Sequence, residues 1–309
     1  MILLEAGNRI LAETVTSVIN ETFEGEEEKR EPMDVRLCDF DDVSYRVTIE
    51  ADARNILKVS MAAPCMSQIS DVGAQVAIDE LYKDISVEAV GGMDVTLSID
   101  LDELKEDAEK KAMIERIKLM RANIVGGVFT YFCKELDAGR KPDSFNFQLR
   151  SDTQVYVYPA KDRVVFIYSL DYPNKAERCI AKIFMQEFKD AKKRIGKAPP
   201  VNFSAVPPRE MQDDGIEEAT CNLGYISFAI LKPHVENDKI RTRVCQQLMA
   251  FRTYMQYHIK CSKSYFHARM RARCRELLKV LDRARIKEDE VGGKKKIKRT
   301  AAGKVFKRH

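Results

Sequence analysis

The 309-residue sequence lacks the short motifs that mark common catalytic and metal sites. It contains no GxGxxG or GxxxxGK[ST] phosphate-binding loop, no HExxH zinc motif, no GxSxG nucleophile turn and no CxxC pair. These motifs place the groups that nucleotide binding, metal-assisted hydrolysis and acyl transfer require. We therefore expect a protein that is not an enzyme and that carries no cofactor.

Long apolar runs are missing as well. No segment approaches the roughly 18 apolar residues of a bilayer-spanning helix, and the N-terminal MILLEAGNRI lacks the basic start and cleavage site of a signal peptide. The eight cysteines are scattered, which predicts reduced and mostly packed thiols. We expect a cytosolic protein without membrane insertion.

Glycine and proline are absent from the 49 residues 237–285. Apolar or small residues recur there at steps of three and four, which predicts one face of a single helix. Such a helix is about 70 Å long at about 1.5 Å per residue, more than a compact domain of this size can cover, so part of the face should meet another protein. The stripe consists of Ile240, Val244, Leu248, Phe251, Met255, Ile259, Ser262, Phe266, Met270, Cys274, Leu277, Leu281 and Ala284.

Charge is unevenly distributed although the net charge is only +4. Residues 1–236 carry 30 basic against 42 acidic side chains, and residues 237–285 carry 13 against 3. A basic C-terminal third on an acidic body suits an acidic partner, which could be a nucleic acid, an anionic membrane surface or an acidic protein polymer.

The remaining pattern repeats once. A helix is predicted over 8–23 and again over 104–138, each followed by strand-like runs and a further helix. We therefore predict an α+β fold of two tandem related α/β domains with antiparallel sheets, followed by a long C-terminal α-helix. The predicted strands are 33–40, 43–51, 56–63, 94–101, 144–150, 153–159, 163–170 and 223–231, with further helices over 67–83 and 175–195. The predicted boundaries are 1–122, 123–236, 237–285 for the helix and 286–309 for a basic flexible tail.

Two clusters of chemically active residues have ordinary explanations. His258 and Cys261 lie one turn apart, but His267 is about 120° round the helix from Cys261, so one straight helix cannot close a three-ligand metal site. Asp39, Asp41 and Asp42 stand in a turn between strands, where Asp is common without acid or base chemistry. We expect neither metal binding nor catalysis at these positions.

Basic and aromatic residues share the polar side of the long helix, where Tyr254, Tyr257 and Tyr265 are interleaved with basic residues. This mixture is typical of nucleic-acid binding, and also of protein interfaces, in which Tyr and Arg are common anchors. We favour a protein partner, and a nucleic-acid-binding protein that uses this helix is the alternative. The basic residues are Arg252, Lys260, Lys263, Arg269, Arg271, Arg273 and Arg275.

Six segments of the sequence carry a family resemblance: MILLEAGNRI, DFDDVSY (39–45), KIFMQEFK (182–189), LGYISF (223–228), YHIKCSKSYFHARMRAR (257–273) and LKVLDRAR (278–285). They resemble subunit 2, the p34 family, of the actin-related protein 2/3 complex, which nucleates branched actin filaments. The resemblance runs in order from Met1 to the AAGKVF of the tail, but the acidic loop 24–31 and the KKKIKR at 294–299 depart from the family pattern.

The resemblance implies a non-catalytic scaffold in the cytoplasmic actin cytoskeleton, at the cell cortex and in projections. Its long helix would pair with the equivalent helix of subunit 4. The pair would hold the actin-related subunits, including the actin-related protein 3 subunit, and touch the side of the mother filament. It implies no DNA binding.

The expected contact residues follow from this assignment and from the charge pattern, because an acidic filament favours a basic, partly apolar surface. For the filament contact we expect Phe251, Arg252, Lys189, Lys192, Lys193 and Arg194. For the interface with subunit 4 we expect Met255, Ile259, Phe266, Met270, Leu277 and Leu281.

Overall fold

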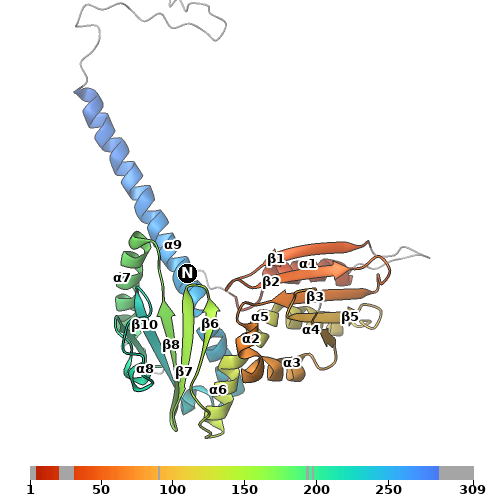
Figure 1. Ribbon diagram of the computed structural model, residues 1–309. Helices are drawn as coiled ribbons and strands as arrows, with labels where there is room; N and C mark the ends of the chain where they lie inside the picture. Colours follow the sequence, from red (N-terminus) through yellow and green to blue (C-terminus); the bar gives the residue numbers. More distant parts are fainter. Residues whose placement is uncertain (1–4, 21–30, 90, 193–194, 197, 285–309) are drawn as a thin grey trace, which may run out of the picture. The chain divides into compact units, whose positions relative to one another are not determined.

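The computed structural model describes residues 5–20, 31–89, 91–192, 195–196 and 198–284, so the acidic loop, except for its last residue, and the basic tail lie outside the described residues. Two five-stranded antiparallel sheets precede a long C-terminal helix, which confirms the predicted α+β class (Figure 1). By internal contacts the chain forms two compact units, Met1–Lys260, which holds both sheets, and Cys261–His309. The predicted domain boundaries remain a prediction.

The first repeat begins with a helix whose first turn is capped by Asn8, because its Oδ1 accepts a hydrogen bond from the Leu11 amide at 2.9 Å. Its strands run in the order β1-β2-β3-β5-β4, and the first three form an antiparallel meander. Its elements are α1 (Arg9–Asn20), β1 (Met33–Cys38), β2 (Ser44–Ile49), β3 (Ile56–Ala62), α2 (Met66–Ile69), the π-helical turn η1 (Ser70–Ala74), α3 (Gln75–Leu81), β4 (Ser86–Glu88), β5 (Val95–Asp100), α4 (Asp107–Lys118) and α5 (Met120–Ile124).

The second repeat has the same strand order, β6-β7-β8-β10-β9, so each strand takes the place of its counterpart in the first sheet. This shared topology confirms that the two sheets are tandem related units. Its elements are α6 (Gly127–Asp137), β6 (Phe145–Arg150), β7 (Thr153–Pro159), β8 (Arg163–Leu170), α7 (Lys175–Lys192), β9 (Val201–Ser204), α8 (Arg209–Asp213), β10 (Gly224–Leu231), the 3-10 turn η2 (Lys232–His234) and finally α9 (Asp238–Arg283).

The central strand β8 of the second sheet is buried on both faces. Phe166 and Tyr168 point into the main core, whereas Val165 and Ile167 join a smaller cluster with Met211 of α8. Successive side chains of a strand point to opposite faces, so this sheet has helices packed on both sides. In β2, by contrast, only every second residue is buried, which is typical of a sheet with one face toward solvent.

Two predicted helices are interrupted. The helix expected over 67–83 is kinked at Val72 and Gly73, where Gly73 has φ +94°. The helix expected over 104–138 is three helices, because the chain breaks at Leu119 as well as near the Gly126-Gly127 pair. Apolar spacing records which face is buried and does not record a bend between two packed turns.

Three short elements were missed altogether. The strands β4 and β9 are edge strands that pair with β5 and β10, and α8 follows a Pro-rich segment. Each has three to five residues, too few to show a period. The strands exist because a neighbouring strand offers hydrogen-bonding partners, which is a tertiary effect.

The long helix was predicted correctly. It begins after Asn237, whose side-chain oxygen accepts hydrogen bonds from the amides of Lys239 and Ile240 at 2.9 and 3.4 Å. The expectation of mostly packed thiols was wrong, however. All eight cysteines are free, but only Cys65, Cys133 and Cys245 are buried.

A close backbone approach between η1 and α6 predicts a sensitive position. A Cβ added at Gly127 would lie 2.5 Å from the Gly73 carbonyl oxygen, so Gly127→Ala must push η1 and α6 apart. We expect a loss of about 1–3 kcal/mol in the free energy of unfolding, measured by urea denaturation. Gly196→Ala is the matched control, since nothing lies within 4 Å of its added Cβ. Equal stability of both variants would contradict the close packing.

Candidate functional site

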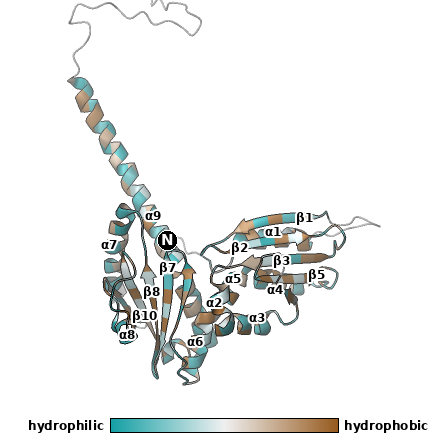
Figure 2. Cartoon of the chain, viewed as in Figure 1, coloured by the Kyte–Doolittle hydropathy of each residue, from teal (hydrophilic) through white to brown (hydrophobic). Residues whose placement is uncertain are grey.

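The long helix α9 divides into a buried and an exposed stretch. From Val244 to Ile259, which is 0% exposed, its apolar stripe is packed in the chain's own core, whereas Ile240 in the first turn is exposed. Beyond Lys260 the same stripe is open, with Phe266 at 50% and Leu277 at 60% exposure. In Figure 2 hydrophobic residues recur among hydrophilic ones along this last part of α9. We call the exposed residues Phe266, Met270, Cys274, Leu277 and Leu281 the seam.

The expected subunit contacts therefore separate into two groups. Met255 and Ile259 lie inside the core of the first unit, so these two are corrected to internal packing residues. The side chains of the other four are 50 to 64% exposed and available to another protein: Phe266, Met270, Leu277 and Leu281. Exposed large apolar side chains in a row mark interaction sites more often than they mark free surface.

Basic side chains accompany the seam. Arg273 pairs with Glu276 at 3.0 Å, and Arg269 donates a 2.6 Å hydrogen bond to the hydroxyl of Tyr265. Among the residues that the structure describes, Arg271 and Lys279 have no ion pair. The exposed stretch thus presents guanidinium and ammonium groups with few internal carboxylate partners.

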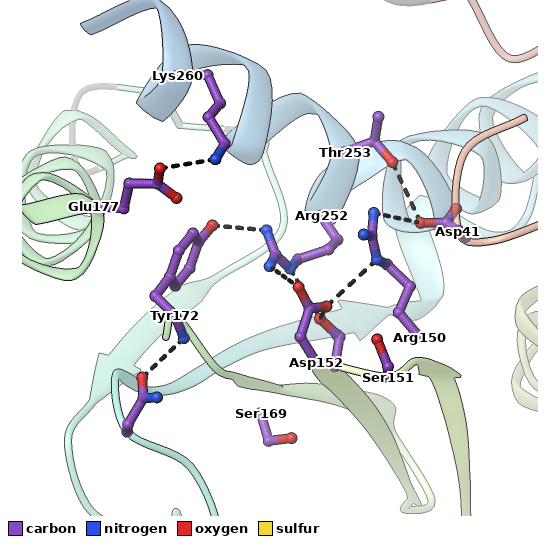
Figure 3. Close-up of polar contacts among 12 residues, drawn as sticks. Asp41, Arg150, Ser151, Asp152, Ser169, Tyr172, Glu177, Arg252, Thr253 and Lys260 are labelled. Carbon is purple, nitrogen blue, oxygen red and sulfur yellow. Dashed lines mark hydrogen bonds and ion pairs between the residues drawn. The ribbon is translucent and has the colours of Figure 1, made fainter. Parts of the chain in front are cut away.

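A buried ionic cluster joins the other stretch of α9 to the second sheet (Figure 3). The Arg252 guanidinium is 1% exposed and donates from Nη2 to Asp152 Oδ2 at 2.8 Å, from Nη1 to the Tyr172 hydroxyl at 2.7 Å, and from Nε to Thr153 Oγ1 at 2.8 Å. All three kinds of guanidinium nitrogen are therefore occupied. About two turns further along α9, Lys260 pairs with Glu177 at 2.7 Å.

The same cluster extends to the first sheet through Asp41. This residue lies in the β1-β2 turn with φ +60° and is 1% exposed. Its carboxylate accepts a hydrogen bond from Arg121 Nη1 at 2.7 Å. It accepts another from Thr253 Oγ1 at 3.3 Å, and Arg150 Nη1 stands 4.0 Å away (Figure 3). Asp41 thus connects the first sheet, the helices and the second sheet.

Burial changes the acid strength of these groups. Desolvation raises the pKa of Asp41, and the positive charges of Arg121 and Arg150 oppose that rise. Desolvation also raises the pKa of Tyr172 to about 12, so its hydroxyl keeps its proton at neutral pH and can accept the hydrogen bond from Arg252. The buried ionic cluster therefore combines charged side chains with neutral hydroxyl groups, and its role is structural.

The expected filament contacts also separate. Arg252 is corrected to a buried residue, because a guanidinium with these internal partners is not at the surface. Phe251 is half-buried among Tyr168, Phe188 and Phe228, with its ring centroid 4.8 Å from that of Phe228. These rings line one side of an apolar cavity of about 790 Å³, except for Tyr168.

The remaining filament residues are on or beyond α7. Lys189 is half-buried near the end of this helix, and Lys192 is its last residue. Lys193 and Arg194 lie outside the described residues. These positions stay predictions.

One buried residue could have been found from the sequence. Arg252 follows Leu248 by four positions and precedes Met255 by three, so its spacing puts it on the apolar stripe. Its pairing with Asp152 and the pairing of Arg121 with Asp41 gave no such signal. Arg252 is 100 residues from Asp152 in the chain, and Arg121 is 80 residues from Asp41.

The metal hypothesis finds no support in the described part of the chain. No group of three or more His, Cys, Asp or Glu side chains there could hold an ion. His258 instead stacks on Phe184, with ring centroids 5.9 Å apart, and meets Tyr254 at 4.6 Å. Likewise, none of the helices within these ranges has the length and hydropathy of a membrane span.

The buried ionic cluster leads to a prediction about the free energy of unfolding. Asp41→Asn keeps the size and the left-handed preference of the residue but removes the charge opposite Arg121, so we expect a loss of about 3 kcal/mol. The measurement is urea denaturation. Asp34→Asn, which breaks the exposed pair with Arg46 in the same hairpin, should change stability little. If Asp41→Asn left the free energy of unfolding unchanged, the buried ionic cluster would contribute nothing to stability.

Comparison with known proteins gives a consistent assignment. The family model described as "Arp2/3 complex, 34 kD subunit p34-Arc" matches residues 59–288. "Actin-related protein 2/3 complex subunit 2" of Dictyostelium discoideum is 30% identical over 313 residues, covering 100% of both chains. The protein of the same name from Schizosaccharomyces pombe is 28% identical over 276 residues, or 82% of this chain and 86% of the relative. The chain therefore belongs to the p34-Arc family, the 34 kD subunits of the Arp2/3 complex.

Proposed function

We propose that this chain is a non-catalytic scaffold subunit of the Arp2/3 complex, which pairs with subunit 4 through the end of α9 and contacts the side of the mother actin filament during branched nucleation. The observation that carries the proposal is the exposed seam on α9. The chain works with other members of the complex, including the actin-related protein 3 subunit, in the cytoplasmic actin cytoskeleton of the cortex and projections.

The seam supports pairing with a second helix. Phe266, Met270, Leu277 and Leu281 follow one another at steps of four, seven and four, which keeps them on one side of α9. Burying a side chain of this size contributes about 1.5–3 kcal/mol. The four side chains are each half or more exposed, so a partner helix that covers them would gain a substantial part of this burial free energy.

The end of α7 supports the filament contact. Lys189 stands in the last turn of this helix next to the half-buried Phe188, and the sequence has a second lysine, Lys192, as the last helical residue. Filaments of actin are acidic, and basic groups at an interface mainly raise the association rate and fix the register. These lysines replace Arg252 as the residues of this proposal.

Pairing is tested with a double change in the seam. Leu277→Asp with Leu281→Asp should abolish co-purification with co-expressed subunit 4, because two carboxylates would be desolvated in an apolar contact. Ser264→Asp adds a carboxylate to the same exposed stretch but about 160° round the helix from Phe266, and should not affect co-purification. Normal recovery of subunit 4 by the seam variant would refute the pairing.

We also expect the chain expressed alone to be poorly soluble.

The filament contact needs a separate measurement. In the assembled complex, Lys189→Glu with Lys192→Glu should leave assembly intact and lower co-sedimentation with filaments, most clearly at low salt. Branch density should fall in parallel. Lys105→Glu with Lys111→Glu, both exposed in the first repeat, is the charge-matched control. If the α7 variant binds and branches as the control does, the contact lies elsewhere although the scaffold role could stand.

A further inference from the structure

We infer that the partner of the seam is an α-helix whose own apolar residues are bordered on both sides by Asp or Glu. This inference rests on the proposed pairing and specifies its chemistry. It follows from the placement of arginines around the exposed apolar residues of α9, because among the described residues only Arg273 of these arginines has a carboxylate partner.

Arginines border the seam on both sides. At about 100° per residue, Phe266, Leu277, Met270, Leu281 and Cys274 span a sector of about 80°. Arg273 and Arg269 then lie about 20° and 60° before the Phe266 edge. Arg271 lies about 60° beyond the Cys274 edge, followed by Arg275. Arg271, Arg275 and Cys274 also line one shallow apolar hollow on this side with Met270.

The charges of the exposed stretch are not balanced internally. Residues 261–283 contain seven Lys and Arg against only Glu276 and Asp282. Glu276 already pairs with Arg273. Among the described residues, the hydrogen-bond partner of Arg275 is a backbone oxygen, that of Arg271, at 3.4 Å. A partner helix with basic borders would therefore meet several uncompensated positive charges at short range, which costs free energy in an interface.

Arginine is suited to this position. Its aliphatic stem can cover the rim of an apolar contact while the guanidinium stays at the edge, where it binds carboxylates in a bidentate way. Acidic residues on the partner would convert the repulsion into attraction on both rims. They would also set which helix is accepted, because like charges exclude other amphipathic helices.

A nucleic acid fits the same surface less well. Phosphates would neutralise the arginines, but Phe266, Met270, Leu277 and Leu281 lie between them and would stay in water. Each would forgo about 1.5–3 kcal/mol of apolar burial. An acid-bordered helix satisfies the arginines and the apolar residues together.

The experiment reverses one border. Full-length Arg271→Glu with Arg275→Glu is co-expressed with subunit 4, and the amount of partner retained is measured at about 0.05 and 0.5 M NaCl, below and above physiological screening. We expect at least tenfold less partner at low salt and a smaller difference at high salt. Lys161→Glu with Lys232→Glu, both exposed in the second repeat, changes the charge equally and should retain the partner. Lysine at the bordering acidic positions of the partner should restore binding.

The outcomes separate this inference from the proposed pairing. If the arginine variant retains subunit 4 normally while Leu277→Asp loses it, pairing stands and the acidic borders are refuted. If neither variant loses the partner, pairing and inference fail together. If the arginine variant keeps its partner but loses binding of a duplex DNA probe, the borders serve nucleic acid, which also overturns the inference.

Discussion

The charge of Asp41 is buried where three parts of the chain meet, and a carboxylate in that position must be neutralised locally. Arg121 and Thr253 supply hydrogen bonds, and Arg150 supplies a second positive charge. Asp41 has the left-handed conformation in the β1-β2 turn, which Asp tolerates better than most residues, and these contacts help to hold it there. The two repeats and the beginning of α9 thus share one polar cluster, and the internal half of that helix is fixed before any partner is involved.

The cluster restricts the fold more than it adds net stability. Desolvating two charges offsets most of the attraction between them, whereas removing one partner leaves the other unpaired. Arg252 shows how complete the compensation is, since each kind of guanidinium nitrogen donates to a different side chain. Packing in the two sheets therefore supplies the stability, and the ionic contacts exclude arrangements in which α9 is shifted along the second sheet.

The periodic parts of the fold could be predicted from the sequence. Alternation along β2 and the three-to-four spacing of α9 report which side of an element is apolar, and this is a local property. The kink at Gly73 and the edge strand β4 depend on what packs beside them, as does the pairing of Asp41 with Arg121 80 residues away. No local pattern records such neighbours.

The candidate site shows the same limit more sharply. Ile259 and Phe266 belong to one stripe, yet the first is in the chain's own core and the second is exposed. Spacing predicts that a face will be covered and does not say by what. Length was the better signal, because a helix of about 70 Å exceeds what one small domain can cover.

Arginine has opposite roles in the two stretches of α9, and the difference is the surrounding medium. At Arg252 the charge is surrounded by protein, so its attraction to Asp152 is strong and insensitive to salt, and its partners must be in the same chain. At Arg271 water screens the charge until a partner excludes it. The interaction free energy of that guanidinium therefore depends on the charge of the partner that approaches. The exposed arginines are thus suited to selecting a partner, and the buried Arg252 is suited to stabilising the fold.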